Sequence, residues 1–315
     1  MRAFPFRLAI LIASLVIGAA SEPVAALTQQ PAVTFKSSVD LVRVSAIVRD
    51  HKGRFVQDLS ARDFEILEGG RVRPITDFRR DFSGVSIALL FDVSGSMEAR
   101  LPNAREAAEH VLSWLEPERD EAAIFTFDTR LVERTPFTTG LTALPASMSS
   151  VVPFGATSLH DAIAQTAQRV GARDGRRRAV VVFTDGLDNW SRLAPGEVSA
   201  AASAIDVPVY IFGVVASIDN PSADTRTSTT VHSPLLGTLA DLASWTGGHV
   251  FMASTPAQRS IAARQIIDEL RHQYLLAFES SNEPGWHALV VRARDKDFTV
   301  RARSGYVSQS PTTLD

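Results

Sequence analysis

The stretch VSIALLFDVSGSM, at residues 85–97, decides the fold of this chain of 315 residues. Its first seven residues, Val85 to Phe91, form a continuous run that is apolar except for one serine, which is typical of a strand covered on both faces. Asp92, Ser94 and Ser96 follow at the end of that strand. The stretch therefore predicts a central strand of an α/β sheet that leads into a polar loop.

Strands and helices alternate downstream of this stretch. Ala179–Phe183 and Pro208–Val215 are further apolar runs, and Leu159, Ile163 and Val170 share one face of a helix. Buried strands separated by helices predict a mostly parallel sheet flanked by helices. The other expected strands are Ala122–Phe127, Leu131–Thr135 and His249–Met252, and the other expected helices are Asn103–Leu115, Gly196–Ile205, Leu235–Trp245 and Ala257–Arg271.

Short strands flank this α/β region on both sides. Val42, Val44, Ala46 and Val48 alternate with other residues, which is the pattern of a half-buried strand. A few short strands at each end cannot make two stable cores, so we expect one small β-sandwich built from both ends, with the α/β domain inserted between them. The alternative is two unrelated flaps packed on the α/β core. The expected flanking strands also include Val56–Leu59, Asp63–Glu68, Tyr274–Phe278, Ala288–Ala293 and Phe298–Ala302.

The N-terminal residues have the pattern of a secretory signal peptide. Arg2 and Arg7 precede an apolar run that is shorter than a membrane span, and small residues follow it. Cleavage near Ala20 or Ala26 would release a secreted or periplasmic bacterial protein with no transmembrane segment in the mature chain, while an uncleaved anchor is the alternative. The expected divisions are a signal peptide at 1–26, an N-terminal β segment at 33–83, the α/β domain at 84–272, a C-terminal β segment at 273–308 and a polar tail at 309–315.

Composition and missing motifs exclude several function classes. The formal net charge of -3 gives no basic surface for nucleic acid, and the absence of cysteine excludes disulfides. The sequence has no nucleophile elbow, phosphate-binding loop or dinucleotide fingerprint, and its histidines lack the spacing of a catalytic zinc site. We therefore expect a protein that is not an enzyme.

Three polar motifs fall where open α/β sheets bind ligands. Asp92-x-Ser94-x-Ser96 follows the first buried strand, Thr157 precedes a helix, and Asp185 ends another buried strand. The crevice beyond the carboxyl ends of the strands would gather these loops. The motifs together predict a single site that combines carboxylate and hydroxyl oxygens.

An oxygen-only site suits a hard divalent cation. Mg²⁺ prefers octahedral oxygen coordination and tends to keep water, while Mn²⁺ and Ca²⁺ are further candidates. If the three hydroxyls contact the ion and the two aspartates act mainly through water or hydrogen bonds, the ion keeps much of its positive charge. It would then attract an external carboxylate, so the expected partner is a protein or matrix ligand that presents an acidic residue.

These motifs resemble the metal-ion-dependent adhesion site of the von Willebrand factor type A domain, in which Asp-x-Ser-x-Ser is followed by a Thr and then an Asp. All five positions are filled here, by Asp92, Ser94, Ser96, Thr157 and Asp185. The resemblance implies a Rossmann-like fold over about 85–271 and a metal that completes its coordination with a partner's Glu or Asp. The flanks, including 44–53 and 300–306, are similar to bacterial type A-related proteins of the acidobacterial kind.

Further residues near the motifs have candidate roles. Asp188, Asn189 and Trp190 follow Asp185 closely and are candidates for a partner-binding rim, and an aromatic beside a charged site is a frequent anchor. For Asp188 and Asn189 the alternative is a solvated loop, and for Trp190 it is packing beneath the loop. Ser158 with Asp161 resembles a capping arrangement at the start of a helix.

Three functions follow from these observations. The first is an exported module that captures an acidic residue of a partner through a bound divalent cation. The second is a structural or assembly factor of an envelope complex, with the β segments as its main interface. The third is a metal-assisted hydrolase, which would need a positioned base that the sequence does not offer.

Overall fold

The computed structural model describes residues 41–80, 84–173, 176–204, 206–214, 234–281 and 283–308. The signal peptide expected at 1–26 and the polar tail at 309–315 lie outside the described residues. Within the described residues, no helix has the length and apolar character needed to cross a membrane.

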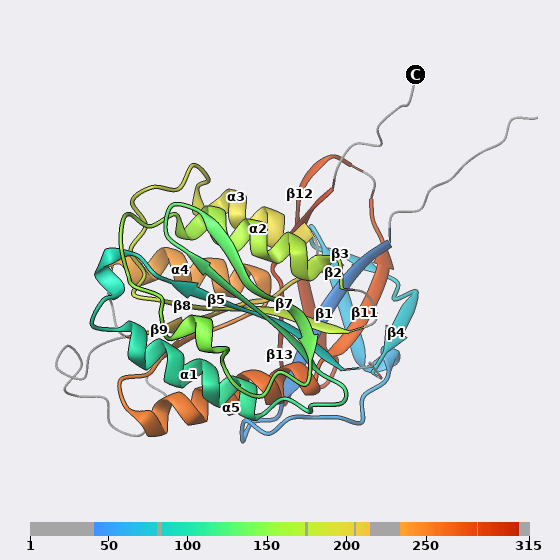
Figure 1. Ribbon diagram of the computed structural model, residues 1–315. Helices are drawn as coiled ribbons and strands as arrows, with labels where there is room; N and C mark the ends of the chain where they lie inside the picture. The colour runs from blue at the N-terminus through green and yellow to red at the C-terminus, as the bar shows by residue number, and fades with distance from the viewer. Residues whose placement is uncertain are drawn as a thin grey trace, which may run out of the picture. The chain divides into compact units, whose positions relative to one another are not determined.

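A six-stranded sheet forms the centre of the α/β region, with β5 in its interior (Figure 1). The strand order is β10-β9-β8-β5-β6-β7, and each neighbouring pair is parallel except β6 with β7. The mostly parallel sheet predicted from the sequence is therefore confirmed. The strands are β5 (Val85–Asp92), β6 (Glu121–Phe127), β7 (Leu131–Thr139), β8 (Arg177–Thr184), β9 (Val209–Gly213) and β10 (Val250–Met252).

Helices cover both faces of this sheet, so the side chains of β5 enter two cores. Ile87 and Leu89 pack with α1 (Leu101–Ser113) and α5 (Pro256–Arg271) on one face. Ala88 and Leu90 pack on the other face with α2 (Leu159–Gly171), α3 (Pro195–Ala204) and α4 (Pro234–Thr246). Burial on both faces explains why the 85–91 run shows no polar alternation beyond Ser86.

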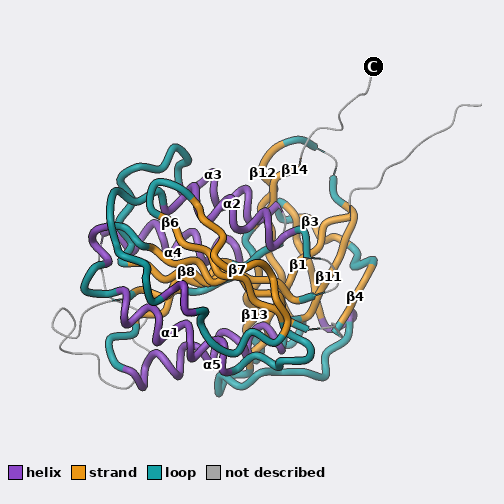
Figure 2. The backbone as a smooth tube through the Cα atoms, in the orientation of Figure 1, coloured by secondary structure: helices purple, strands orange, loops and turns teal. Residues whose placement is uncertain are grey.

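The flanking strands form two four-stranded antiparallel sheets, and each sheet contains strands from both ends of the chain (Figure 2). Their facing side chains share one core, which includes Val44, Phe64, Leu276 and Tyr306. Strands far apart in sequence therefore complete one another. One sheet joins β1 (Leu41–Arg49), β4 (Asp77–Arg79), β11 (Tyr274–Glu279) and β13 (Thr299–Ala302), and the other joins β2 (Phe64–Glu68), β3 (Arg71–Arg73), β12 (Gly285–Ala293) and β14 (Gly305–Ser308).

The prediction of a strand over Val56–Leu59 is wrong. Only Phe55 forms an isolated bridge, with Arg49, and the chain then leaves the sheet. The Tyr274 hydroxyl donates to the carbonyl of Val56 at 2.8 Å and accepts from the amide of Leu59 at 3.3 Å. A side chain from the other end of the sequence thus satisfies backbone groups that a partner strand would otherwise pair.

A buried ion cluster ties α5 to the antiparallel sheet that contains β1 and β13. The fully buried carboxylate of Glu269 pairs with Arg49 of β1 at 3.1 Å and with Arg301 of β13. Burial alone would raise the pKa of Glu269, but these two guanidinium groups and Gln265 bring it below its usual value. Glu269 therefore stays ionised at neutral pH and holds two arginines in place.

Replacing Glu269 with alanine tests how much this cluster contributes. We expect Glu269→Ala to lower the free energy of unfolding by about 2–4 kcal/mol, because two arginines lose their buried partner while keeping partial access to water. Urea denaturation at pH 7 measures the loss. Asp268→Ala on the same helix removes an exposed pair with Arg264 and should change stability by less than about 1 kcal/mol. Equal effects of the two variants would contradict this account.

Candidate metal centre

The loops after β5 and β8 meet at the carboxyl edge of the central sheet. The parallel register pairs Phe91 with Phe183, which places Asp92 beside Thr184. The Thr184 hydroxyl donates to Oδ2 of Asp92 at 2.7 Å, and the other carboxylate oxygen accepts from the amide of Ser94 at 3.0 Å. The Asp92 carboxylate is therefore buried in a fixed orientation. It stands at the start of the loop that carries Ser94 and Ser96, which we call the serine loop.

The two serines of that loop lie together. Their hydroxyl oxygens, on Ser94 and Ser96, are 3.2 Å apart. A short 3-10 helix, Gly95–Met97, turns the chain between them, and the buried side chain of Met97 anchors that turn in the core. Two hydroxyls thus stand side by side immediately after a buried carboxylate.

Thr157 joins this group through the backbone of its own loop. The amide of Gly95 donates to the carbonyl of Gly155 at 3.1 Å, and Gly155 adopts a left-handed φ of 86° that favours glycine. The Thr157 amide donates to Oδ1 of Asn189 at 2.8 Å, and its side chain is buried. The segment 155–157 is therefore held between the serine loop and the loop after β8.

Asp185 lies close enough to Asp92 for its charge to act on it. Burial raises the pKa of Asp92 to about 6, the nearby Asp185 carboxylate adds to that rise, and hydrogen bonds from Ser94 and Thr184 oppose it. One guanidinium nitrogen of Arg100 stands 3.7 Å from Asp185 and also donates to the carbonyl of Ser96 at 2.9 Å. The site thus brings together two carboxylates with one arginine at its edge.

The donor set fits a hard divalent cation. Two carboxylates with repelling charges favour a cation between or near them, and the Ser94, Ser96 and Thr157 hydroxyls add neutral oxygen donors. Among the described residues, no group of three or more His, Cys, Asp or Glu side chains is arranged to hold a metal. Any ion here would therefore rely on hydroxyl oxygens as much as on charge.

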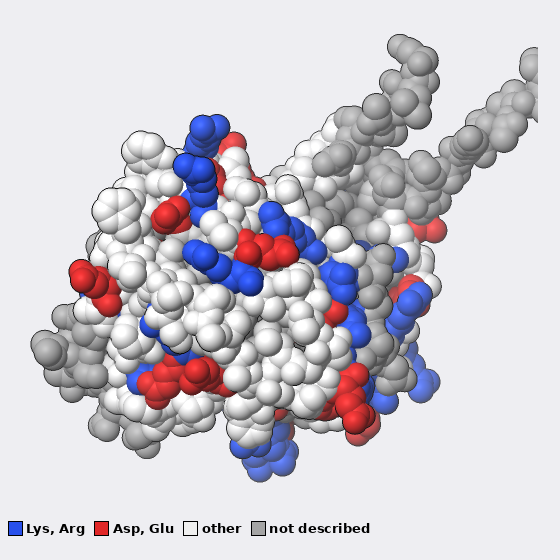
Figure 3. All heavy atoms as spheres, viewed as in Figure 1, with Lys and Arg blue, Asp and Glu red and all other residues white. Residues whose placement is uncertain are grey.

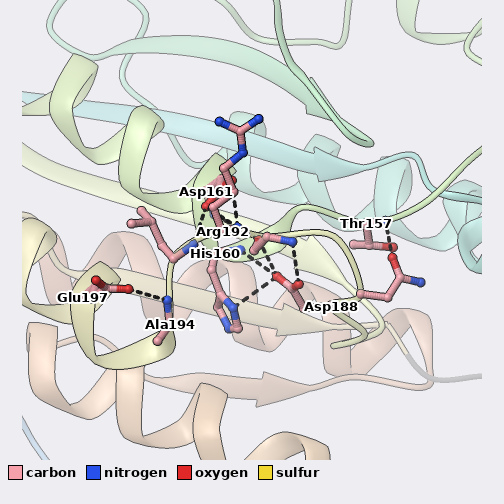
Figure 4. Close-up of polar contacts among 10 residues, drawn as sticks. Thr157, His160, Asp161, Asp188, Arg192, Ala194 and Glu197 are labelled. Atoms are coloured by element: carbon pink, nitrogen blue, oxygen red, sulfur yellow. Dashed lines mark hydrogen bonds and ion pairs between the residues drawn. The ribbon is translucent and has the colours of Figure 1, made fainter.

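Two of the three predicted rim residues, Asp188 and Asn189, make internal hydrogen bonds (Figure 4). The Asp188 carboxylate accepts from the His160 amide at 3.0 Å and from the Ser191 hydroxyl at 2.6 Å, and it pairs with the His160 ring at 3.1 Å. These hydrogen bonds hold its pKa below the usual value, although burial acts in the opposite direction. Trp190, by contrast, is 64% exposed.

The capping role predicted for Ser158 and Asp161 is wrong. Ser158 precedes α2, but its side chain makes no capping hydrogen bond. The Asp161 carboxylate instead accepts from the backbone amides of Arg192 and Leu193, at 3.2 and 2.9 Å (Figure 4). Asp161 therefore anchors the loop that carries Trp190, which a local sequence pattern could not indicate.

Sequence reasoning missed Arg100, Thr184 and Phe154 at this edge. Arg100 follows Ser96 by four residues and directly precedes α1, and no known motif includes an arginine at this spacing. Thr184 stands inside the Thr184-Asp185-Gly186 motif, yet its bond to Asp92 depends on strand register. Phe154 is next to the Gly155 motif, and its exposure becomes visible only in the fold.

Comparisons with known proteins found similar solved structures. No curated protein sequence matches the chain. A type A domain from Catenulispora acidiphila covers 88% of this chain and 76% of its own, at 12% identity and a TM-score of 0.47. An aerotolerance-related membrane protein from Bacteroides fragilis covers 59% of this chain and 98% of its own, at 20% identity and a TM-score of 0.49. Proximal thread matrix protein 1 from the mussel byssus was solved with a zinc-occupied metal-ion-dependent adhesion motif. It covers 64% of this chain and 49% of its own, at 19% identity and a TM-score of 0.47.

The family assignment rests on the sequence rather than on these distant structures. The family model described as the von Willebrand factor type A domain matches residues 87–187. That span carries all the predicted metal-site residues, Asp92, Ser94, Ser96, Thr157 and Asp185. This part of the chain therefore matches the von Willebrand factor type A domain.

Proposed function

We propose that the protein is an exported binding module that captures an acidic residue of a partner protein or matrix component through a divalent cation. The observation that carries the proposal is the buried Asp92 carboxylate, which lies near Asp185 and beside the paired hydroxyls of Ser94 and Ser96. A type A domain match across this site supports it. The function proposed is binding and not catalysis.

The residues would share the work of holding the ion. Ser94, Ser96 and Thr157 would supply hydroxyl oxygens, and Asp92 and Asp185 would supply charge while staying bonded to their neighbours. Mg²⁺ matches this donor set best, and Mn²⁺ and Ca²⁺ use the same kind of oxygen ligands. Bound there, the cation would act as a Lewis acid that attracts a carboxylate from outside the chain.

The cellular place of this module is part of the proposal. The N-terminal pattern at 1–26 supports export to the periplasm or the exterior of a bacterium, where adhesion to other surface proteins would occur. The net charge of -3 gives no support to nucleic acid as a partner.

A second candidate function, assembly of an envelope complex through the β-sandwich, is favoured by one apolar row. Val290, Leu67 and Val72 are direct cross-strand neighbours in the β14-β12-β2-β3 sheet. Val290 and Val72 are both more than half exposed, and Trp286 of the same sheet is also exposed. An apolar row on a solvent-facing sheet suits an interface that needs no metal.

A pull-down from the envelope fraction separates the two functions. The tagged full-length protein should retain partners in Mg²⁺ and lose them in EDTA, because the ion provides the link to the partner. Ser94→Ala should lose them in either buffer, whereas Ser149→Ala, an exposed serine outside the site, should behave as the wild type. Circular dichroism checks that both variants stay folded. Capture that persists in EDTA and is lost in Val290→Asp would contradict the metal-dependent function and favour the sandwich interface.

The charge of Asp92 should destabilise the metal-free protein. A rise of the pKa from 3.8 to about 6 corresponds to about 3 kcal/mol at pH 7, since the folded state resists ionisation. In EDTA, Asp92→Asn should therefore unfold at higher urea than the wild type at pH 7. The difference should shrink as the pH falls from 6 toward 4, where the folded wild type takes up the proton.

Mg²⁺ should change the stability of the wild type but not that of Asp92→Asn. Saturating Mg²⁺ should stabilise the wild type and leave Asp92→Asn unchanged, because the variant lacks the charge that holds the ion. A metal-free Asp92→Asn protein that is less stable than the wild type at pH 7 would show that Asp92 carries no unfavourable charge.

A further inference from the structure

The most exposed large apolar side chains of the described residues belong to the loops that supply Thr157 and follow Asp185 in the candidate metal centre. Phe154 is 80% exposed, Val152 is 79% exposed and Trp190 is 64% exposed. All three stand on the loops that precede α2 and α3. These loops lie toward the upper left of Figure 1, and in Figure 3 that part of the surface carries uncharged side chains beside a few charged ones. Side chains of this size are rarely left in water without a function when they gather at one place.

Backbone hydrogen bonds tie two of these residues, Phe154 and Trp190, to the segments that carry the candidate metal ligands. The amide of Phe154 donates to the carbonyl of Val93 at 2.9 Å, and Val93 stands between Asp92 and Ser94. The amide of Trp190 donates to the carbonyl of Thr157 at 3.0 Å. These two hydrogen bonds fix the backbone of Phe154 at the start of segment 154–157 and the backbone of Trp190 beside its last residue, Thr157.

The loop that carries Trp190 is held by buried or half-buried polar contacts (Figure 4). Asp188 bonds to His160 and to Ser191, and Asp161 bonds to the backbone on the far side of Trp190. A side chain on a loop that is already fixed loses little conformational freedom when a partner covers it. Trp190 is thus presented to a partner before binding.

Phe154 and Trp190, which we call the apolar collar, and the charged centre together indicate one kind of ligand. The centre holds two carboxylates with Arg100 at its edge, and a bound cation would leave it attractive to one carboxylate. The exposed side chains of Phe154 and Trp190 cannot form ion pairs with a ligand, but they can bury its apolar groups. Aromatic side chains dominate such contacts.

We infer that the partner presents an Asp or Glu whose flanking residues are aromatic or aliphatic, with Phe154 and Trp190 packing against those flanking side chains. The inference rests on the proposed metal-dependent function and specifies its ligand. Phe154 and Trp190 select the ligand, while Ser94, Ser96 and Thr157 hold the ion.

Synthetic peptides of one frame test this specificity. Three labelled peptides carry a central Glu flanked by Phe and Leu, a central Glu flanked by Ser, or a central Gln flanked by Phe and Leu. Fluorescence anisotropy with the full chain in Mn²⁺ should show the first peptide binding at least tenfold tighter than either of the others. EDTA should abolish its binding.

Variants of the collar separate specificity from metal binding. Phe154→Ser and Trp190→Ser should each weaken binding of the first peptide at least fivefold. Both variants should leave the affinity for Mn²⁺, measured by calorimetry without peptide, unchanged. Ile261→Ser is the matched control, since it removes an exposed large apolar side chain from α5, and it should change neither value.

Each contrary result has a definite meaning. Equal binding of the two Glu peptides, no binding of any peptide by Mn²⁺-loaded protein, or metal-dependent binding to anionic phospholipid vesicles in place of peptides would overturn the inference and leave the metal site standing. Absence of Mn²⁺ binding to the wild type would overturn the proposed function, and the inference with it.

Discussion

The buried carboxylate of Asp92 is the constraint on which the rest of the site depends. It ends the interior strand of the central sheet, it lies near Asp185, and two hydrogen bonds from Ser94 and Thr184 offset only part of the cost of its burial. A protein gains stability by moving such a charge to the surface or by neutralising it. We propose that Asp92 is retained at this edge of the sheet because its carboxylate helps to hold a cation.

The fold supplies this charge with fixed surroundings. Packing of β5 between two helical layers leaves its end no freedom to turn away, and parallel pairing with β8 places Thr184 against Asp92. Two further loops then close around the site through backbone hydrogen bonds from Gly95 and Trp190. Glu269 of α5 connects the antiparallel sheet that contains β1 and β13 to the helical layer of α1 and α5, and α1 begins close to the site.

Much of this could be predicted from the sequence because its signals are local. The apolar run over 85–91 identifies a strand buried on both faces, and the Asp-x-Ser-x-Ser spacing that follows it needs no tertiary information. The features that were missed depend on residues that meet only in the fold. Tyr274 replaces a partner strand at Val56, and Asp161 anchors a loop thirty residues later instead of capping its own helix.

Diffraction from a crystal soaked in Mn²⁺ tests the central claim most directly. An anomalous peak in contact with the hydroxyls of Ser94, Ser96 and Thr157, with Arg100 moved away from Asp185, is the predicted result. The reason is that the ion would take over the neutralising role of the guanidinium group at this edge. Saturating Mn²⁺ with no anomalous peak at these hydroxyls, and with Arg100 still beside Asp185, would contradict the account.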